Sequence, residues 1–218
     1  IFFNRKIFRD TVKNFLAAYK GADKIIVYDN YSTDNTVELL MMDSMVEIRK
    51  IDTGNQIRDD LYLQMKNNAW KEARGLADWV IIVDFDEVFN RVSDCHSVGL
   101  NIKPVFDLDL SIPFDEGYNI IKPYGFNMVE MAAPLYADGH PFEYSQKGTQ
   151  HPPAEKMCCF RPDQIKEINY VAGCHGATPE AMEGKQVKIY YHPEYVELHY
   201  KCWNFERYIQ EMEIIPLR

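Results

Sequence analysis

Three carboxylates that follow a short apolar run are the residues of this sequence best suited to chemistry. Residues 80–83 form a continuous β-branched segment, and Asp84, Asp86 and Glu87 come directly after it. Carboxylates this close repel one another unless a positive charge lies among them, and a divalent cation with oxygen ligands would supply that charge. The alternative is a polar turn that ends a strand, in which the acids are solvated or cap a helix.

The elements that would position these acids alternate between strands and helices over the first ninety or so residues. This alternation is the pattern of a parallel sheet with right-handed crossovers. We expect residues 80–83 to be buried on both faces in the middle of that sheet, with the acids at its carboxyl edge, where open α/β sheets bind ligands. In chain order, the expected elements are strands at 1–3, 24–28, 46–51 and 80–83 and helices at 10–19, from Thr36 onward and at 58–73.

The helix expected at 58–73 has a periodic apolar pattern. Leu61, Met65 and Ala69 recur at intervals of four, which places them on one face of a helix. Lys66 and the other polar residues of the segment fall on different faces. The spacing therefore predicts an amphipathic helix with the first set as its apolar face.

After residue 90 the rhythm of long helices ends, and prolines and aromatic residues become frequent. We interpret this half as loops and short antiparallel strands around a pocket, so that residues 1–218 form one domain. Residues 1–90 would be its ligand-binding half and residues 91–218 its second half. Further elements are expected as strands at 108–113, 118–121, 156–160 and 188–191 and a helix at 203–215.

Composition narrows the classes of protein. The net charge of the 218-residue chain is −9, which disfavours a nucleic-acid partner. Its five cysteines are odd in number and form no CxxC pair, which indicates a reducing compartment, the cytoplasm, rather than a disulfide framework or a zinc ribbon. No apolar run reaches the roughly 18 residues of a membrane span, so at most peripheral membrane association is expected. The chain opens inside an apolar run, which suggests that it is trimmed at the front.

Three motifs together resemble one family. Residues 27–36 (Val-Tyr-Asp-Asn-Tyr-Ser-Thr-Asp-Asn-Thr) resemble the strand-end signature of family 2 glycosyltransferases, and residues 83–87 (Val-Asp-Phe-Asp-Glu) look like the DXD motif of sugar transferases with the GT-A fold. Residues 173–177 and 198–201 are similar to the Gly-x-His and His-Tyr-Lys stretches of a family-2-like branch. The order and spacing of the motifs extend the resemblance over nearly the whole chain.

This resemblance implies an α/β chain with the GT-A, Rossmann-like fold and a mostly parallel central sheet. It also implies a metal-dependent glycosyltransferase that moves a sugar from a nucleotide diphosphate, with UDP favoured, to an acceptor hydroxyl with inversion. A carbohydrate or glycolipid acceptor in surface polysaccharide or lipopolysaccharide synthesis is the family's usual role. One departure is Tyr31, which replaces the usual glycine of the first motif, so that this turn need not adopt a positive φ.

The resemblance assigns a metal site. Asp86 is the expected direct ligand of Mn²⁺ or Mg²⁺, and Asp84 is expected nearer the ribose or the water shell of the metal. His175 would complete the coordination or touch the diphosphate, and a histidine ligand would favour Mn²⁺. The alternative for His175 is a hydrogen-bonded loop histidine between two glycines.

The resemblance also indicates residues that bind the nucleotide. Asp29 ends the second strand and could accept hydrogen bonds from uracil or ribose, although an Asx turn or a helix cap is the alternative. Asp34 fits a structural cap of the following helix better. The further candidates are Asn4 and Arg5 beside the base and Lys156, His199 and Lys201 near the diphosphate charge.

For the catalytic base, Glu155 is the first candidate and Asp115 the second. Glu155 precedes an expected strand in the second half, and Asp115 lies in a loop between a proline and a glycine. Two other functions stay open. A nucleotidyltransferase would carry a glycine-rich basic loop after the first strand, and residues 4–9 have the charge but no glycine. A non-catalytic module that binds nucleotide sugars would keep the fold without the base.

Overall fold

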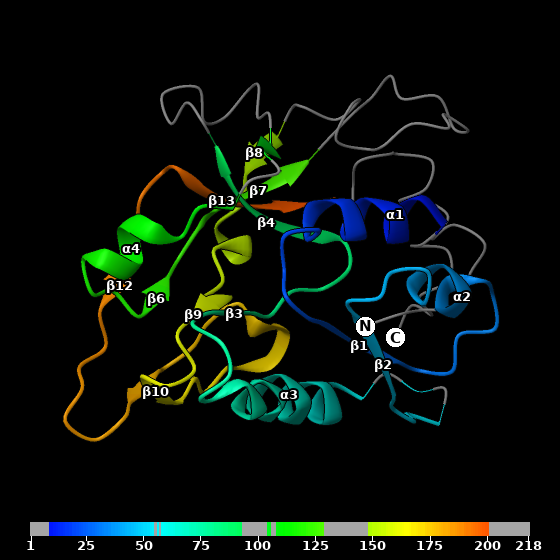
Figure 1. Cartoon of the computed structure of the whole chain (residues 1–218), viewed down its shortest axis with the longest axis horizontal. Coiled ribbons are helices and arrows are strands. Elements are labelled where there is room, and N and C mark those ends of the chain that lie inside the picture. Colours follow the sequence, from blue (N-terminus) through cyan, green and yellow to red (C-terminus); the bar gives the residue numbers. More distant parts are fainter. Residues whose placement is uncertain are drawn as a thin grey trace, which may run out of the picture.

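The computed structural model describes residues 9–54, 56, 58–92, 104–105, 108–128 and 148–200. This part of the chain is a mixed α/β structure with several small sheets (Figure 1). The first half contains α1 (Arg9–Ala18), β1 (Ile25–Asp29), α2 (Thr36–Leu40), β2 (Val46–Lys50), α3 (Asp59–Asn68), the 3₁₀ helix η1 (Ala69–Ala73), β3 (Val80–Ile81) and β4 (Glu87–Val92). The second half contains β5 (Pro104–Val105), α4 (Ser111–Asp115), β6 (Ile120–Ile121), β7 (Tyr124–Met128), β8 (Gly148–Gln150), η3 (Pro152–Ala154), β9 (Cys159–Phe160), β10 (Ile165–Glu167), η4 (Ala172–Cys174), β11 (Glu180–Ala181), β12 (Ile189–Tyr190) and β13 (Tyr195–His199).

The expected strands at 24–28 and 46–51 are confirmed as a parallel pair. β1 and β2 pair in register from Ile25 opposite Val46 to Asp29 opposite Lys50. An apolar cluster that includes Val27 packs this pair against α1 and α2. The strand–helix–strand unit therefore forms where the alternating sequence pattern predicts it.

β3 does not lie in the middle of a parallel sheet, and that expectation is wrong. It is the two-residue edge strand of the sheet β12-β6-β9-β3 and pairs antiparallel with β9. The apolar run nevertheless contacts apolar clusters on two sides. Val80 and Ile82 pack against the cluster around Trp70, whereas Val83 packs against the cluster of β1. Two-sided packing explains why every residue of the run is apolar, although the pairing differs.

α3 ends earlier than expected and buries another face. The segment after Asn68 continues as the 3₁₀ helix η1. The buried residues are Tyr62, Lys66 and Trp70, whereas Leu61 and Met65 are only half-buried. The helix is therefore rotated relative to the expected apolar face, and it points a lysine toward the interior.

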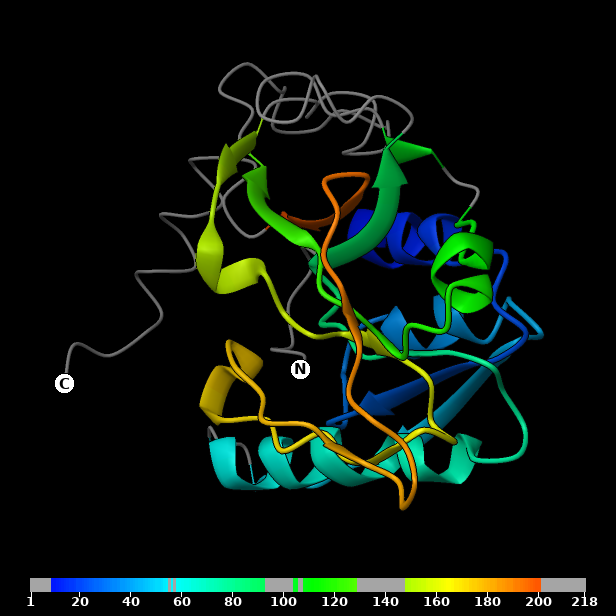
Figure 2. The same ribbon diagram turned by 90° about the vertical axis from the view of Figure 1, so that its left-hand side faces the viewer.

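A five-stranded sheet in the order β5-β4-β13-β7-β8 holds the second half together. β13 lies between β4, with which it is antiparallel, and β7, with which it is parallel. β3 and β9 lie between this sheet and α3 (Figures 1 and 2). The hydroxyl of Tyr19, the residue directly after α1, accepts a hydrogen bond from the Phe89 backbone N–H at 2.9 Å and ties the end of α1 to β4.

The second half agrees in part with expectation. Short strands form within the stretches expected at 118–121, 156–160 and 188–191, as β6, β9 and β12. The strand expected at 108–113 is wrong, because Ser111–Asp115 is the helix α4. The Asp109 carboxylate accepts a hydrogen bond from the Ser111 backbone N–H at 2.9 Å, a local bond that competes with strand pairing. The helix expected at 203–215 and the strand at 1–3 lie outside the described residues.

Among the described helices, none has the length and apolar composition needed to cross a bilayer.

Candidate functional site

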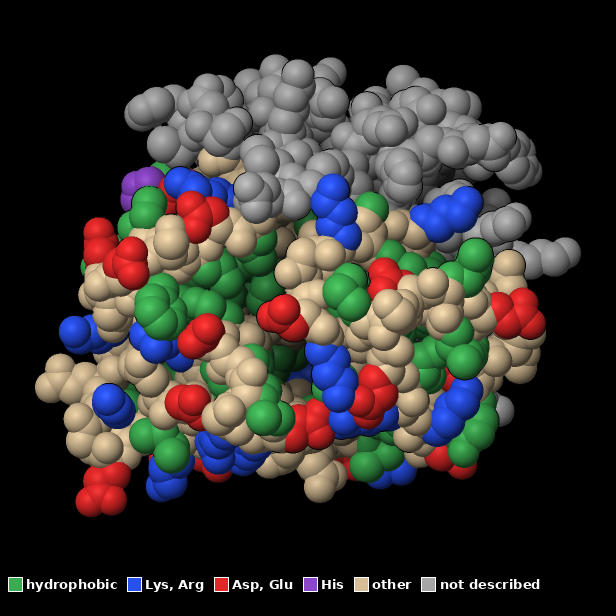
Figure 3. All heavy atoms as spheres, in the orientation of Figure 1, with side chains coloured by type: hydrophobic (Ala, Val, Ile, Leu, Met, Phe, Trp, Pro, Cys, Tyr) green, Lys and Arg blue, Asp and Glu red, His purple; other side chains and the backbone are tan. Residues whose placement is uncertain are grey.

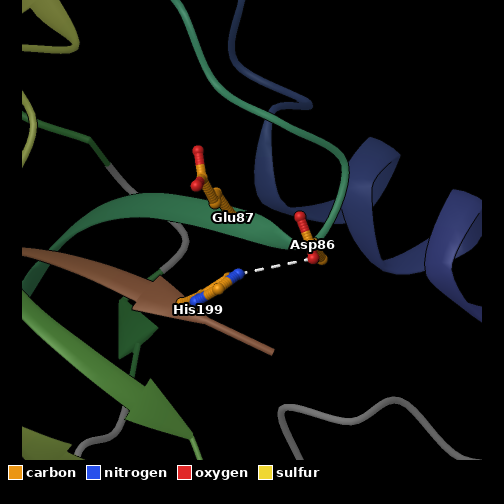
Figure 4. Close-up of side chains that lie close together, drawn as sticks. All are labelled: Asp86, Glu87 and His199. Atoms are coloured by element: carbon orange, nitrogen blue, oxygen red, sulfur yellow. Dashed lines mark ion pairs between the residues drawn. The ribbon is translucent and has the colours of Figure 1, made fainter. Parts of the chain in front are cut away.

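Asp86, Glu87 and His199 form a cluster at the end of β13 and the start of β4. Glu87 is the first residue of β4 and lies directly opposite His199, the last residue of β13. One ligand atom from each of the three side chains lies within 4.8 Å of the others. Figure 4 shows the His199 ring pointing from β13 toward the Asp86 carboxylate. Two carboxylates and an imidazole are a donor set that suits a divalent cation.

Both ring nitrogens of His199 face oxygen atoms. Nε2 lies 3.4 Å from Asp86 Oδ2, and Nδ1 lies 3.0 Å from Oδ1 of the Asn127 amide on β7. Asn127 therefore fixes the orientation of the ring and leaves Nε2 directed at Asp86. Burial acts to raise the pKa of Asp86, but the hydrogen bond and the charge of His199 outweigh it, so the pKa is lowered. The Asp86 carboxylate is thus available as an anion.

Glu87 is committed to partners inside the protein. Only 2% of the residue is exposed, and its carboxylate makes an ion pair with the Lys156 ammonium. Its second oxygen accepts a hydrogen bond from the Asp84 backbone N–H at 3.0 Å. A cation that used Glu87 as a ligand would have to displace Lys156.

Asp84 is neutralised by two lysines. Lys66 Nζ of α3 lies 2.7 Å from Asp84 Oδ1, and Lys156 Nζ lies 3.9 Å from Oδ2. Burial acts to raise the pKa of Asp84, but the two ammonium groups hold it well below its usual range. For Lys66 and Lys156, burial acts to lower the pKa and the neighbouring carboxylates more than offset it. All three side chains are therefore charged at neutral pH.

A further carboxyl group, Glu197, lies on the same face of the sheet. It is fully buried, and its carboxyl group lies beside the Cys158 thiol and the Glu87 carboxylate. Burial and the nearby charge of Glu87 raise its pKa well above the usual value. Glu197 therefore keeps its proton to a higher pH than an exposed glutamate does.

The chain crosses this face of the sheet closely because one position of β7 is glycine. Gly125 lies opposite Glu197, and a Cβ atom there would lie 2.5 Å from the carbonyl oxygen of His151 and 2.6 Å from the carbonyl carbon of Ala154. Any larger residue would push this segment away from the sheet. The close approach is what brings Lys156 to Glu87.

Among the described residues, no lysine forms an ion pair with Asp86. Lys66 contacts Asp84, and Lys156 contacts both Asp84 and Glu87. Asp86 is also the most exposed of the three, at 37% of its side chain against 24% for Asp84 and 3% for Glu87. Acidic and basic side chains are interspersed on the molecular face in Figure 3, so any attraction for a cation from this side is local.

The other strand end with an acid is closed. Asp29, only 1% exposed, makes an ion pair with Lys50 and accepts a hydrogen bond from the Ser32 backbone N–H at 3.2 Å. Burial acts to raise its pKa, but the hydrogen bonds from Lys50 and Ser32 lower it. The structure therefore shows Asp29 in a local turn with Ser32, which is the alternative to nucleotide binding. With Tyr31 in place of the usual glycine, this turn was not expected to need a positive φ. Tyr31 nevertheless has a φ of +54°.

Asp34 is not the N-cap of the following helix, which is Asn35, but its carboxylate accepts a hydrogen bond from the Thr36 backbone N–H at 3.0 Å in a local turn at the helix start. His175 is exposed, and its Nδ1 lies 2.7 Å from the carbonyl oxygen of Pro153. This contact fits the alternative of a hydrogen-bonded loop histidine. It is not a member of the cluster of Asp86, Glu87 and His199.

The two candidate bases lie elsewhere. The Glu155 carboxylate lies 3.3 Å from Lys122 Nζ and accepts a hydrogen bond from the Tyr191 hydroxyl at 3.2 Å. Asp115 is exposed at the end of α4. Asn4, Arg5 and Lys201 lie outside the described residues.

Sequence reasoning brought forward five residues that meet here, namely Asp84, Asp86, Glu87, Lys156 and His199. It missed Lys66, Asn127 and Glu197. A lysine between Tyr62 and Trp70 at intervals of four was the one signal available for Lys66. Asn127 and Glu197 gave none, because their roles depend on the position of β13 between β4 and β7.

The chain matches no protein-family model and no curated protein.

Proposed function

We propose that the chain is a divalent-cation-dependent glycosyltransferase that uses a nucleotide diphosphate sugar, with UDP favoured. The observation that carries the proposal is the contrast within the cluster. Asp84 and Glu87 are neutralised by lysines, whereas Asp86 is the more exposed carboxylate and has His199 beside it. A cation held by Asp86 and His199 would need the remaining ligands from water or phosphate oxygens, which suits a diphosphate.

The residues of the chain would act as follows. Asp86 and His199 would hold the cation, and the imidazole favours Mn²⁺ over Mg²⁺. Once bound, the cation would neutralise the charge that develops on the leaving diphosphate. Asn127 would orient His199 through its 3.0 Å contact with Nδ1. Lys156 and Lys66 would keep Glu87 and Asp84 neutralised whether or not a ligand is present.

The GT-A fold, the acceptor and the base belong to the same proposal. The parallel β1–β2 pair with its flanking helices and the acids at the end of the 80–83 run support a nucleotide-binding α/β half. Glu155 is proposed as the base and Asp115 as the second choice, acting on a carbohydrate or glycolipid acceptor. For Glu155 to accept a proton, its pair with Lys122 would have to open.

Calorimetric titration with UDP tests the proposal. The wild type should bind UDP with Mn²⁺ present and at least about tenfold more weakly without it. Asp86→Ala should lose this metal dependence. Asp78→Ala is the matched control, because Asp78 is an exposed acid just before β3, and it should behave like the wild type. Failure of both UDP and GDP to bind the wild type in the presence of Mn²⁺ would overturn the proposal.

A second function is a non-catalytic module that binds nucleotide sugars. It is favoured by one observation, namely that Glu155 faces Lys122 and Tyr191 rather than the cluster. Hydrolysis of a UDP-sugar without added acceptor separates the two functions. Release of UDP by the wild type and its loss in Asp86→Ala would support the enzyme, whereas binding without any turnover would support the module.

A further inference from the structure

We propose that Tyr31 is the residue on which the base of the bound nucleotide stacks. The inference rests on the proposed function and adds the residue that grips the planar, heteroaromatic part of the donor. Three features of the described structure lead to it: the backbone conformation of Tyr31, the exposure of its ring, and the position of its loop relative to the carboxylate cluster.

Tyr31 has a φ of +54°, a left-handed conformation that bulky side chains rarely adopt. The surrounding loop holds it there. Asp29 accepts a hydrogen bond from the Ser32 N–H at 3.2 Å, and the Asn30 amide donates to Thr53 Oγ1 at 2.9 Å while its oxygen accepts from the Thr53 N–H at 3.2 Å. A glycine would adopt this conformation without strain, so the side chain of Tyr31 calls for another explanation. Such strain is concentrated at functional sites.

The ring of Tyr31 is presented to solvent rather than to the core. Tyr31 is 55% exposed, which makes it the most exposed aromatic residue among those described; Tyr191 follows at 46%. Lys50 Nζ lies over the ring, 5.4 Å from its centroid, and also pairs with the buried Asp29 carboxylate. Lys50 therefore supports the ring from one side and leaves the rest of it open to a ligand.

The Tyr31 loop and the carboxylate cluster meet the same stretch of α3. Asn30 is bonded to Thr53, and Thr53 in turn contacts the hydroxyl of Tyr62 on α3. Four residues further along the helix, Lys66 contacts Asp84. Residues four apart lie on one face about one turn, or 5.4 Å, apart. The Tyr31 loop and Asp84 are thus linked to successive turns of the same helix, through Thr53 and Tyr62 on one side and through Lys66 on the other.

The chemistry of the loop favours stacking over hydrogen-bond recognition of the base. The Asp29 carboxylate is already occupied by Lys50 and Ser32. An exposed aromatic ring, by contrast, can stack on any base, because every base has a π face. Tyr31 should therefore add affinity for UDP and GDP alike, and it should add none for a diphosphate that carries no base.

The test compares UDP with pyrophosphate, both titrated with Mn²⁺ present. Tyr31→Ala and Tyr31→Gly should weaken UDP binding about five- to a hundredfold and leave pyrophosphate binding unchanged, and Tyr31→Phe should retain UDP binding. Tyr31→Gly should also keep or raise the melting temperature, because glycine accepts a positive φ. Asn169→Gly is the matched control, since Asn169 has a φ of +52° in another loop, and it should leave UDP affinity unchanged.

Each other outcome overturns the inference in a distinguishable way. If Tyr31→Gly binds UDP like the wild type while the wild type binds pyrophosphate with Mn²⁺, the stacking role fails and the proposed function stands. If Tyr31→Gly weakens UDP and pyrophosphate equally, or lowers the melting temperature, Tyr31 has a structural role. If the wild type binds neither probe, the proposed function and the inference fail together.

Discussion

Two apolar runs of this chain, β1 and residues 80–83, end in acidic residues, and the two ends differ in the basic residues that contact those acids. At the end of β1, Asp29 lies directly opposite Lys50 of β2, and the two form an ion pair. After residues 80–83, two lysines from distant segments neutralise Asp84 and Glu87 and leave Asp86 beside His199. The first end is closed by its neighbouring strand, whereas the second keeps one anion open.

This difference teaches that an acid after an apolar strand does not by itself make a cation site. A β-branched run precedes both acids, directly before Asp84 and with Tyr28 in between before Asp29. What separates them is the number of carboxylates relative to the lysines within reach. Among the described residues, the one acid of the first end pairs with one lysine, whereas the three acids of the second end meet two lysines.

The largest expected effect is the loss of Lys156 at the open end. Lys156→Met would leave the Glu87 carboxylate buried without its ion pair, and breaking one partner of such a pair costs about 3–5 kcal/mol of the free energy of unfolding. Urea denaturation measures it. Lys166→Met removes a lysine whose side chain is 62% exposed and should change stability by less than about 1 kcal/mol. Equal effects from the two variants would contradict a buried network.

The second effect concerns the orientation of His199. Asn127→Ala removes the oxygen that lies 3.0 Å from Nδ1 of the ring, and loss of such an outer partner lowers metal affinity about 10- to 100-fold. Titration with Mn²⁺ measures the change, and the melting temperature of the metal-free protein shows whether the fold is intact. Unchanged affinity would mean that His199 does not hold the cation.

The third effect is a loss of stability as pH rises, which the raised pKa of Glu197 predicts at the open end. The lowered pKa of Asp29 at the closed end predicts the opposite, a loss as pH falls. Burial raises the pKa of Glu197 in the folded state, so its contribution to stability is full below the unfolded pKa of about 4.3 and is lost as pH rises toward the folded pKa. Glu197→Gln should remove this loss. Its stability relative to the wild type should therefore increase with pH, by at most about 1.4 kcal/mol per pH unit, between the unfolded pKa and the raised folded pKa.

Urea denaturation at pH 5, 6 and 7 checks that slope. The exposed Glu180→Gln serves as the control and should show the same stability difference at each pH. A constant difference for Glu197→Gln as well would mean that Glu197 is ionised in the folded protein.

The smallest effect is expected at the closed end. Lys50→Met removes the partner of Asp29, but the Lys50 side chain is 47% exposed and the Ser32 N–H still donates to the carboxylate. The loss should be about 1 kcal/mol by urea denaturation, well below that of Lys156→Met. A larger loss here than for Lys156→Met would reverse the comparison between the two ends.

Parts of the fold could be read from the sequence because they depend on near neighbours. The pair of strands at 25–29 and 46–50 and the helices beside them follow from apolar periodicity and short connections. The edge position of β3 could not be read, because residues 80–83 are apolar on both sides whether they pair with a parallel strand or with β9. For α3, Leu61 and Met65 suggested an apolar face, yet the ion pair with Asp84 makes Lys66 a buried residue.

The sequence by itself determined that Asp84, Asp86 and Glu87 are crowded and need positive charge, because they lie within four residues of one another. Only the tertiary structure decided which of them receives a lysine. Glu87 and Lys156 are 69 residues apart, and they meet because Gly125 lets the chain cross the sheet closely. Charge neutralisation depends on distance in space, and contacts between residues this far apart in the chain have no local pattern to predict them.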